Sequence, residues 1–560
     1  MINYFLHHLV ILPILLPIAT AALLLFYDER RRKLKLWISL SSIGLLVLVS
    51  IGLIGRAIDV SPHAEVYNLG NWQAPFGIVL VLDRLSAAMV FLASILAVAS
   101  LVFSAAHWHK AGPHFHSLMQ FMIAGVNGAF LTGDLFNLFV FFEVMLTASY
   151  GLALHGSGQA KVRAGMHYVV INLIASSFFL IGAALIYGVC GTLNMADLAL
   201  KLQTLKSADR IIFESGAAIL GIAFLVKAGM WPLNFWLTPT YSAVAAPVGA
   251  TFAILSKVGI YVVLRLTLLV FGTNGGTLTG FGNDILFYGG LATLIFGFIG
   301  VLASQALGRL ASYSVLVSSG TLLAAIGTGN ASLTAGALFY IVSSTLSLAA
   351  FFLLVELVER SQDTAANVLA VTMEVYGEDE EDEEDEVGTY IPATLAILGA
   401  CFGITAILII GMPPFSGFVA KFMMITGVFN PDGLNGNGYQ PSARDWTFVA
   451  LLIFSGFAAL IAMTRTGIRT FWASIEGKVP RVQVIEFAPV AGLLGLCLLL
   501  TIAAGPVAGY MGKAAEELHH PQNYIDSVLP PQETVAVSPI PSKEMTAGLI
   551  DKVEVERGMK

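Results

Sequence analysis

Long apolar stretches separated by short polar segments run along most of this chain. A helix needs about 20 apolar residues to cross the hydrocarbon core of a bilayer. Stretches of that length recur up to about residue 510, so the pattern predicts an all-α membrane protein with about 14 transmembrane helices. The predicted spans are 9–27, 34–55, 79–105, 115–133, 135–154, 165–190, 211–230, 245–271, 285–305, 308–327, 332–358, 390–411, 447–468 and 485–510.

The seventh and twelfth predicted spans run into proline-containing segments, residues 229–236 and 411–418. Proline removes a backbone donor, and inside a membrane the carbonyls that it frees are tolerated where they line a polar cavity. A lysine lies close to each segment, Lys227 to the first and Lys421 to the second. Broken helices in matching positions are typical of transporters built from inverted repeats. The sequence thus predicts two such repeats, helices 4–8 and 9–13, with proline-broken helices 7 and 12 at their centre.

The same pattern divides the chain into regions. An acidic run at 377–386 reads as a solvated linker, with a cation-attracting segment as the alternative. Residues 56–78 predict an ordered loop, and residues 195–206 have the helical apolar spacing of an interfacial helix. The predicted regions are N-terminal helices in 1–110, a first repeat in 111–272, a second repeat in 280–470 that includes the acidic run, a C-terminal helix in 485–510 and an extramembrane tail in 511–560.

Lysine and arginine in the short loops predict the orientation, because cytoplasmic loops carry an excess of them. The basic cluster of residues 30–35 marks the cytoplasmic side, and each further span changes the side. Because the number of predicted spans is even, both termini are predicted to lie outside. The opposite loops carry chiefly Lys201, Lys206, Arg210 and Arg444. The residues that fall on the cytoplasmic side are Lys110, Lys161, Arg163, Arg309, Arg360, Arg465, Arg469, Lys478 and Arg481.

Composition excludes several classes of function. Hydrophobic residues make up 57% and charged residues 12% of the chain, against about 25% charged in soluble domains. There is no basic face for nucleic acid, and no Walker loop or dinucleotide fingerprint. Cys190, Cys401 and Cys497 are too far apart to form a metal or disulfide pattern, so we expect neither cofactor nor metal ion. For the histidines of one cytoplasmic loop, an interfacial loop is favoured over a metal site: His107, His109, His114 and His116.

The candidate chemistry lies in charges that fall inside the apolar spans. Lys227 and Lys257 are about 30 residues apart, and a lysine at the bilayer centre costs roughly 2.5–3.5 kcal/mol on the insertion scale. Glu143, in a phenylalanine-rich span, is the natural partner of Lys227. A buried carboxylate and a buried ammonium can exchange a proton with a small energy gap. The alternative is a structural ion pair, which leaves Lys257 and Lys421 unexplained.

Four ionisable groups on four helices, Glu143, Lys227, Lys257 and Lys421, suit a row of proton-transfer stations bridged by water. His167 is a candidate for the same relay because an ordinary histidine titrates near pH 6.5; a packing histidine is the equal alternative. The other polar candidates carry less weight, since Ser and Thr also pack membrane helices. They are Asn137, Ser256, Tyr313, Ser318 and Ser319, with Asn172, Ser176, Ser177, Thr251, Ser343 and Ser344 as further residues that can hold water.

Four motifs, residues 134–143, 225–236, 255–261 and 411–421, resemble those of the antiporter-like membrane subunits. This family is shared by respiratory complex I, membrane-bound hydrogenases and multisubunit Mrp-type cation/proton antiporters. The local sequences around Glu143 and Lys257, and the chain length, are most similar to those of the Mrp type. Complex I relatives commonly have histidines where this chain has residues 241–247 and 317–319, and often a lysine at position 167; the acidic run is not part of the pattern.

The resemblance implies a proton-translocating subunit of a Na⁺(cation)/H⁺ antiporter in the bacterial plasma membrane. Glu143 and Lys227 would form the pair of the first half-channel, Lys257 the central relay and Lys421 the terminal station. The implied partners are a large A-type subunit and small membrane subunits, with Na⁺ moving mainly through a partner because lysines repel cations. The alternatives are a proton-pumping subunit of a redox-driven complex, and a structural anchor with inert buried ion pairs.

Overall fold

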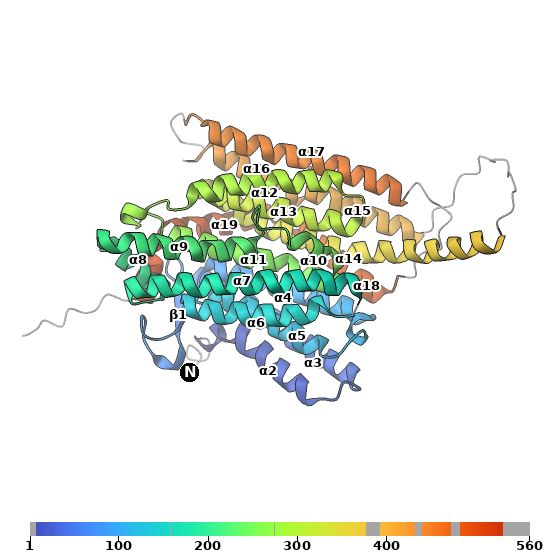
Figure 1. Cartoon of the computed structure of the whole chain (residues 1–560), viewed down its shortest axis with the longest axis horizontal. Helices are drawn as coiled ribbons and strands as arrows, with labels where there is room; N and C mark the ends of the chain where they lie inside the picture. The colour runs from blue at the N-terminus through green and yellow to red at the C-terminus, as the bar shows by residue number, and fades with distance from the viewer. Residues whose placement is uncertain are drawn as a thin grey trace, which may run out of the picture.

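The computed structural model describes residues 7–156, 158–273, 275–376, 393–431, 439–471 and 482–529. The acidic run 377–386, Lys478, Arg481 and the tail beyond residue 529 lie outside the described residues. Most helices run side by side along one axis and form a bundle (Figure 1). The chain is a multi-pass helical membrane protein, because 12 of the helices in its described part are long and apolar enough to cross a membrane.

The secondary structure is almost entirely helical. The elements in chain order are η1 His8–Val10, α2 Leu12–Phe26, α3 Arg32–Val60, β1 Glu65–Asn68, η2 Leu69–Asn71, β2 Val79–Leu82, α4 Arg84–Ser104, η3 Trp108–Lys110, α5 Phe115–Leu131, α6 Leu135–Ala153, α7 Gln159–Cys190, α8 Met195–Gln203, α9 Ser207–Ala228, α10 Leu237–Ala243, α11 Ala246–Leu269, η4 Gly276–Leu278, α12 Asn283–Ala303, α13 Leu307–Ile326, α14 Ala331–Tyr376, α15 Ala393–Ile410, α16 Ser416–Phe429, α17 Ala443–Phe471, α18 Val484–Ile502, α19 Ala504–His519 and α20 Pro521–Val528.

The predicted spans and the observed helices agree in place but not always in length. Twelve of the predicted spans coincide with the helices that meet the length and hydropathy of a membrane span. The spans predicted at 9–27 and 115–133 correspond to shorter helices, α2 with 15 residues and α5 with 17. The apolar helix α16 is also short, with 14 residues, and was expected only as the continuation of a broken helix. An all-helical membrane fold is therefore confirmed, whereas the number fourteen stays a prediction.

The prediction is wrong at the start of the third span, where residues 79–82 form a strand. β2 pairs with β1 as an antiparallel hairpin in which Glu65 faces Leu82 and Asn68 faces Val79. Helix α4 starts only at Arg84, because Asp83 caps it: the Asp83 side chain accepts from Ser86 N at 2.8 Å. Apolar residues alone could not distinguish this buried strand from a helical turn.

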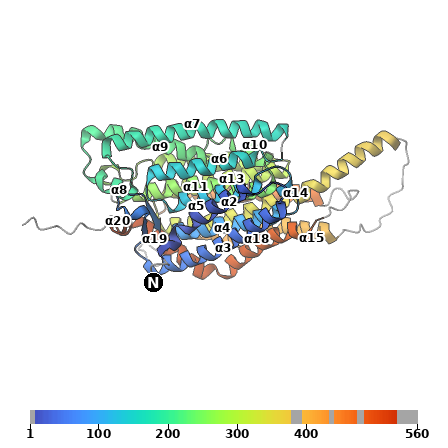
Figure 2. The ribbon, with the colours of Figure 1, turned by 90° about the horizontal axis from the view of Figure 1, so that it is seen from below.

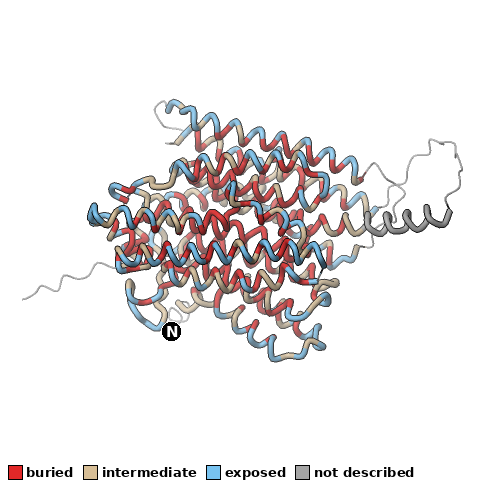
Figure 3. The backbone as a smooth tube through the Cα atoms, viewed as in Figure 1, coloured by how far each residue is buried: buried red, intermediate tan, exposed pale blue. Residues whose placement is uncertain are grey.

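Helix α11 lies inside the bundle in both perpendicular views (Figures 1 and 2). It packs against α4, α5, α9, α13 and α14, and the apolar stretch that is long enough to cross a membrane is buried along its whole length. The outer helices, in contrast, alternate buried and exposed turns (Figure 3). Their exposed positions are mostly large apolar side chains such as Leu173, Ile181 and Phe457, as expected of a surface that faces lipid.

Both described ends of the chain lie at one end of the bundle. His8 Nδ1 is 3.0 Å from Tyr67 Oη in β1, and Ala64 N donates to Ser527 Oγ of α20 at 3.1 Å. Helix α14 reaches the opposite end of the bundle (Figure 1), where its Arg360 donates to Glu486 of α18. We call these the hairpin end and the α14 end. The predicted helix 485–510 is divided into α18 and α19, and α19 continues across the predicted boundary of the tail to pack on α14.

Candidate functional site

Lys227 is buried near the C-terminal end of α9, with 5% of its side chain exposed. Its ammonium donates to Asn172 Oδ1 of α7 at 3.3 Å and lies 5.3 Å from the centre of the Phe142 ring. Asn172 is itself held in place, because its Nδ2 donates to Tyr168 O at 2.8 Å. The ammonium therefore has one neutral acceptor and one aromatic face around it, a weak substitute for the water that it has lost.

Glu143 approaches the same face of α7 from α6. Its carboxylate accepts a hydrogen bond from the Ser176 hydroxyl, and Ser176 lies four residues after Asn172. Residues four apart stack on one face of a helix, so Glu143 and Lys227 both reach toward a single polar stripe on α7. In the described part of the chain no ion pair within 4.0 Å joins the two. The predicted partners are thus held close to one stripe by separate polar contacts.

The end of α9 follows directly from the sequence around Gly229. Gly229 has φ of +74°, a left-handed conformation that suits glycine at a helix end, and Met230 N donates back to Leu225 O at 3.0 Å. The irregular segment that follows is tied to the helix by Trp236, whose Nε1 donates to Val226 O at 3.1 Å. These bonds occupy backbone carbonyls just beside Lys227, so the lysine sits at a fixed helix end.

Lys257 begins a row of hydrogen-bonded side chains, most of which are serine hydroxyls. It is 0% exposed on the central helix α11, and its Nζ donates to Ser318 Oγ of α13 at 2.7 Å. Ser318 in turn donates to Ser344 Oγ of α14 at 3.1 Å. Both hydrogen bonds run in the same direction, with the donor nearer α11 and the acceptor nearer α14. No carboxylate within 4.0 Å balances the ammonium in the described residues, although a buried ion costs several kcal/mol.

The row continues toward Lys421 through the residue next to Ser344. Ser343 Oγ and Ser416 Oγ, on α14 and α16, are 2.9 Å apart. Lys421 lies on α16, 8% exposed, and its Nζ donates to Ile410 O at the end of α15, at 2.8 Å. Polar groups from α11, α13, α14 and α16 therefore lie in sequence across the bundle. Both Ser343 and Ser344, expected only as minor water-holding residues, belong to it.

The remaining predicted residues fall into three places. Asn137 belongs to the cap of α6: its N donates to Asp134 Oδ1 and its Nδ2 to Thr132 Oγ1, both at 2.9 Å. Ser256 and Ser319 are buried next to Lys257 and Ser318 in sequence, and neither hydroxyl has a hydrogen-bond partner in the structure. His167 and Tyr313 instead line one cavity between α7 and α13, apart from the hydroxyl row.

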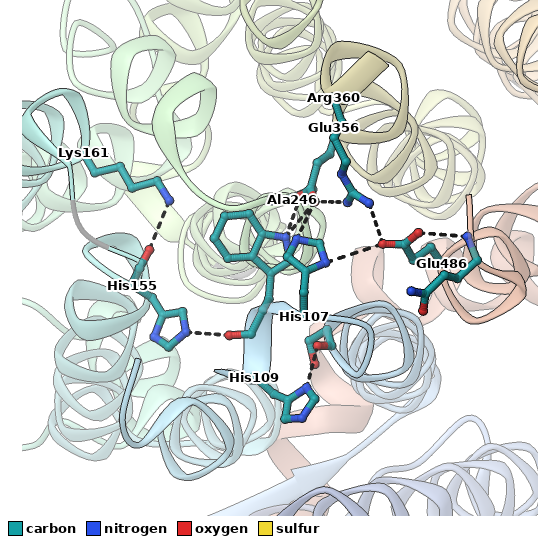
Figure 4. A network of polar contacts seen from close by, with 11 residues as sticks. His107, His109, His155, Lys161, Ala246, Glu356, Arg360 and Glu486 are labelled. Carbon is teal, nitrogen blue, oxygen red and sulfur yellow. Dashed lines mark hydrogen bonds and ion pairs between the residues drawn. The ribbon is translucent and has the colours of Figure 1, made fainter. Parts of the chain in front are cut away.

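A polar network at the α14 end is centred on Glu356 and was not predicted from the sequence (Figure 4). The Glu356 carboxylate accepts from Trp108 Nε1 at 2.8 Å and from Arg360 at 2.6 Å, and His107 Nε2 lies 3.1 Å away. Arg360 also donates to Glu486 of α18 at 2.7 Å. A carboxylate near a helix end ordinarily reaches toward water. The network instead joins α14, α18 and the loop around η3.

His109 of this loop and His155, which follows α6, serve as neutral hydrogen-bonding groups. His109 Nδ1 lies 3.0 Å from Ser104 O, and His155 Nε2 lies 2.9 Å from Trp108 O (Figure 4). Burial lowers the pKa of both imidazoles below the ordinary value. Both histidines are therefore neutral at pH 7, where they fix the backbone of the loop.

Gly259 sets the distance between α11 and α9 beside Lys227. A Cβ at this position would lie 2.8 Å from Ala228 N and 3.1 Å from the carbonyl carbon of Lys227, and both contacts are backbone. Gly259→Ala gains about 1 kcal/mol of helix propensity, but the overpacking costs roughly 1–3 kcal/mol. We expect a lower thermal midpoint of the purified protein and slower transport. Gly221→Ala, on α9 with nothing within 4 Å, is the matched control and is expected to keep both. A Gly259→Ala protein as stable as that control would contradict this role.

A bundle of membrane helices with lysines buried inside it is typical of membrane proteins that transport ions. Comparison with known proteins identifies the family. Residues 132–436 match the family described as NADH:quinone oxidoreductase/Mrp antiporter, transmembrane. The chain belongs to this family, as its four motifs predicted.

Two similar proteins are named as antiporter subunits. The chain is 59% identical, over 94% of its length and 98% of the relative, to a probable K⁺/H⁺ antiporter subunit of Rhizobium meliloti. It is 35% identical, over 93% of its length and 99% of the relative, to a Na⁺/H⁺ antiporter subunit of Alkalihalophilus pseudofirmus. Both relatives are named as D-type subunits of their antiporters, in agreement with the Mrp-type wording around Glu143 and Lys257.

Solved structures resemble the fold over nearly the whole chain. A chain of the Mrp complex from a Dietzia species superposes with a TM-score of 0.78 at 25% identity, covering 94% of this chain and 99% of that one. A chain of respiratory complex I from Thermus thermophilus gives a TM-score of 0.70 at 20% identity, covering 91% and 99%. The second likeness shows the fold alone.

Proposed function

We propose that this chain is the proton-translocating subunit of a multisubunit antiporter that exchanges protons for a monovalent cation. It is a transporter subunit and not a catalytic enzyme. The observation that carries the proposal is that three lysines are buried across the bundle, with Lys227 beside the polar stripe of α7 and a row of hydroxyls between Lys257 and Lys421. Relatives named as K⁺/H⁺ and Na⁺/H⁺ antiporter subunits support antiport over the redox-driven alternative.

In this proposal Glu143 and Lys227 load the proton. They share the polar stripe of Asn172 and Ser176 on α7, so a change of charge on one is felt by the other without a direct ion pair. Water between the two would complete the transfer. The Lys227 ammonium lies between the Asn172 oxygen and the face of the Phe142 ring.

The proton then moves along hydrogen bonds that already have a direction. The Lys257 ammonium donates to Ser318, and Ser318 donates to Ser344, so the chain is set for transfer from α11 toward α14. Ser343 and Ser416 extend it to α16, where Lys421 is the terminal station. Ser256 and Ser319, buried hydroxyls without partners, offer places for the waters that bridge Lys257 to its neighbours.

The finer architecture belongs to the same proposal. Fourteen crossings form two inverted repeats, in which α9 with α10 and α15 with α16 are the broken helices. The α14 end, with Arg163, Arg309 and the cluster 30–35, is cytoplasmic by the positive-inside rule. The described ends of the chain, at residues 7 and 529, then lie outside, at the hairpin end. The cation passes mainly through a partner, a large A-type subunit, because buried ammonium groups repel cations.

Everted membrane vesicles test the proposal. In vesicles that hold the whole assembly and an acid interior, addition of K⁺ or Na⁺ is expected to release protons, which a pH-sensitive dye reports. Vesicles from cells that lack only this chain are expected to show no cation-dependent release, and its re-expression to restore it. An assembly that purifies with iron–sulfur or flavin subunits, and that moves protons only during electron transfer, would establish the redox-driven alternative instead.

A further inference from the structure

A large cavity opens on the side of the bundle at the α14 end, apart from the lysine row. It has a volume of about 1120 Å³ and lies between α7, α10, α12 and α13. Figure 1 shows the short helix α10 between α7 and α13, and α10 packs against both. The proposed proton stations Glu143, Lys227, Lys257 and Lys421 are not among the described residues that line it.

The arginine and histidine side chains around this cavity make its lining basic. Arg163 and His167 lie on α7 and Arg309 on α13, and no aspartate or glutamate is among the described residues of its lining. Both arginines are exposed, and neither has an ion-pair partner within 4.0 Å in the described chain. Glu359 accepts from the backbone N of Gly308, the residue before Arg309, at 3.3 Å, but its carboxylate is not among the groups that line the cavity. Two guanidinium groups beside one cavity favour an anion and disfavour a cation pathway.

Two neutral polar residues also line the cavity, Asn234 and Tyr313. Asn234 is only 3% exposed, and its amide Nδ2 is itself buried, so this nitrogen faces away from the open part of the cavity. A tyrosine hydroxyl can donate to an acceptor. An anion with several oxygens would therefore bind both arginines and could accept from Tyr313 as well.

The outer wall of the cavity is apolar and turned toward lipid. Phe235 is 59% exposed, and Phe296 of α12 is exposed beside it. On α7 the next turn toward the hairpin end presents the exposed Val170, and on α12 the exposed Ile299 lies between the lining residues Phe296 and Gly300. An occupant that enters here therefore meets cationic donors at the α14 end and an apolar surface toward the hairpin end.

We propose that this cavity binds an anionic phospholipid, with its phosphate between Arg163 and Arg309 and its acyl chains along α7 and α12. Basic pockets between membrane helices on the cytoplasmic side are typical sites for anionic headgroups. Free phosphate would use the arginines but leave the apolar wall exposed, so the lipid satisfies more of the site. The lipid would also brace α10, the short helix that follows the break after Lys227.

The test measures lipid retained by the purified assembly in native mass spectrometry. The delipidated protein is mixed with phosphatidylglycerol or with phosphatidylcholine of the same acyl chains. We expect a retained phosphatidylglycerol that the double variant Arg163→Gln/Arg309→Gln loses roughly tenfold or more, from about 1 kcal/mol per arginine. Arg469→Gln, an exposed arginine at the same end and outside the cavity, is the control and is expected to keep it.

Further arms separate the sources of the phosphate and protect the test from misfolding. Inorganic phosphate at high concentration is expected not to displace the lipid, whereas displacement would assign the site to the free anion and overturn the proposal. Equal retention of phosphatidylcholine, or unchanged retention in the double variant, would also overturn it. Arg163→Lys/Arg309→Lys keeps the charge and is expected to recover most of the binding, which a misfolded protein would not do.

Discussion

Lys227→Ala is expected to abolish cation-dependent proton release in everted vesicles while the protein stays in the membrane. The lysine is buried at the end of α9, and only Asn172 accepts from its ammonium. Removal leaves no titratable group on α9 at this depth, so the step between Glu143 and the rest of the row has no carrier. The lost ammonium was poorly compensated, so its removal costs little stability and the effect falls on transport.

Matched variants separate this effect from a loss of positive charge or of folded protein. Lys206→Ala removes an exposed lysine at the other end of the same helix and is expected to keep full exchange. Amounts of each variant in the membrane are compared by immunoblot. Near-normal exchange by Lys227→Ala would defeat the proposed proton path. A lower yield of assembly with normal transport per molecule would instead support the alternative role as a structural anchor.

The sequence predicted the helices well because the physics that places them is local. Runs of about 20 apolar residues and the prolines in 229–236 and 411–418 are visible without any tertiary contact. The hairpin at 65–82 was missed because the apolar residues of β2 pair with a segment more than ten residues away. Local pattern cannot distinguish a short buried strand from a helix.

The lysines of the site could also be predicted from local sequence, whereas their hydrogen-bond partners could not. A lysine in an apolar span is conspicuous, so Lys227, Lys257 and Lys421 stood out, and the structure buries all three. Which of the many serines bonds to which lysine depends on helix packing, which the sequence does not display. Ser318 and Ser344 are 26 residues apart on different helices, and Glu356 meets Trp108 across 248 residues. Such pairs follow from topology and not from spacing.

The buried pair of Asp83 and Arg265 shows the same limit and leads to the second large effect. The Asp83 carboxylate caps α4 and also accepts from Arg265, 182 residues later on α11. Arg265 also donates to Tyr261 Oη at 3.1 Å and lies over the Tyr524 ring of α20. The pair therefore fixes α4, α11 and the C-terminal helices together at the hairpin end.

We expect Arg265→Met to destabilise the protein by roughly 3–5 kcal/mol, because it leaves the Asp83 carboxylate buried without its partner. Asp83→Asn keeps a side-chain acceptor for the cap of α4, so its cost reports the lost ion pair. The double variant Asp83→Asn/Arg265→Met is expected to be more stable than Arg265→Met alone, since no uncompensated charge remains. Thermal unfolding of the purified assembly, followed by tryptophan fluorescence, measures all three. Additive losses in the double variant would mean that the two groups are not coupled, and that α11 is held at this end by packing alone.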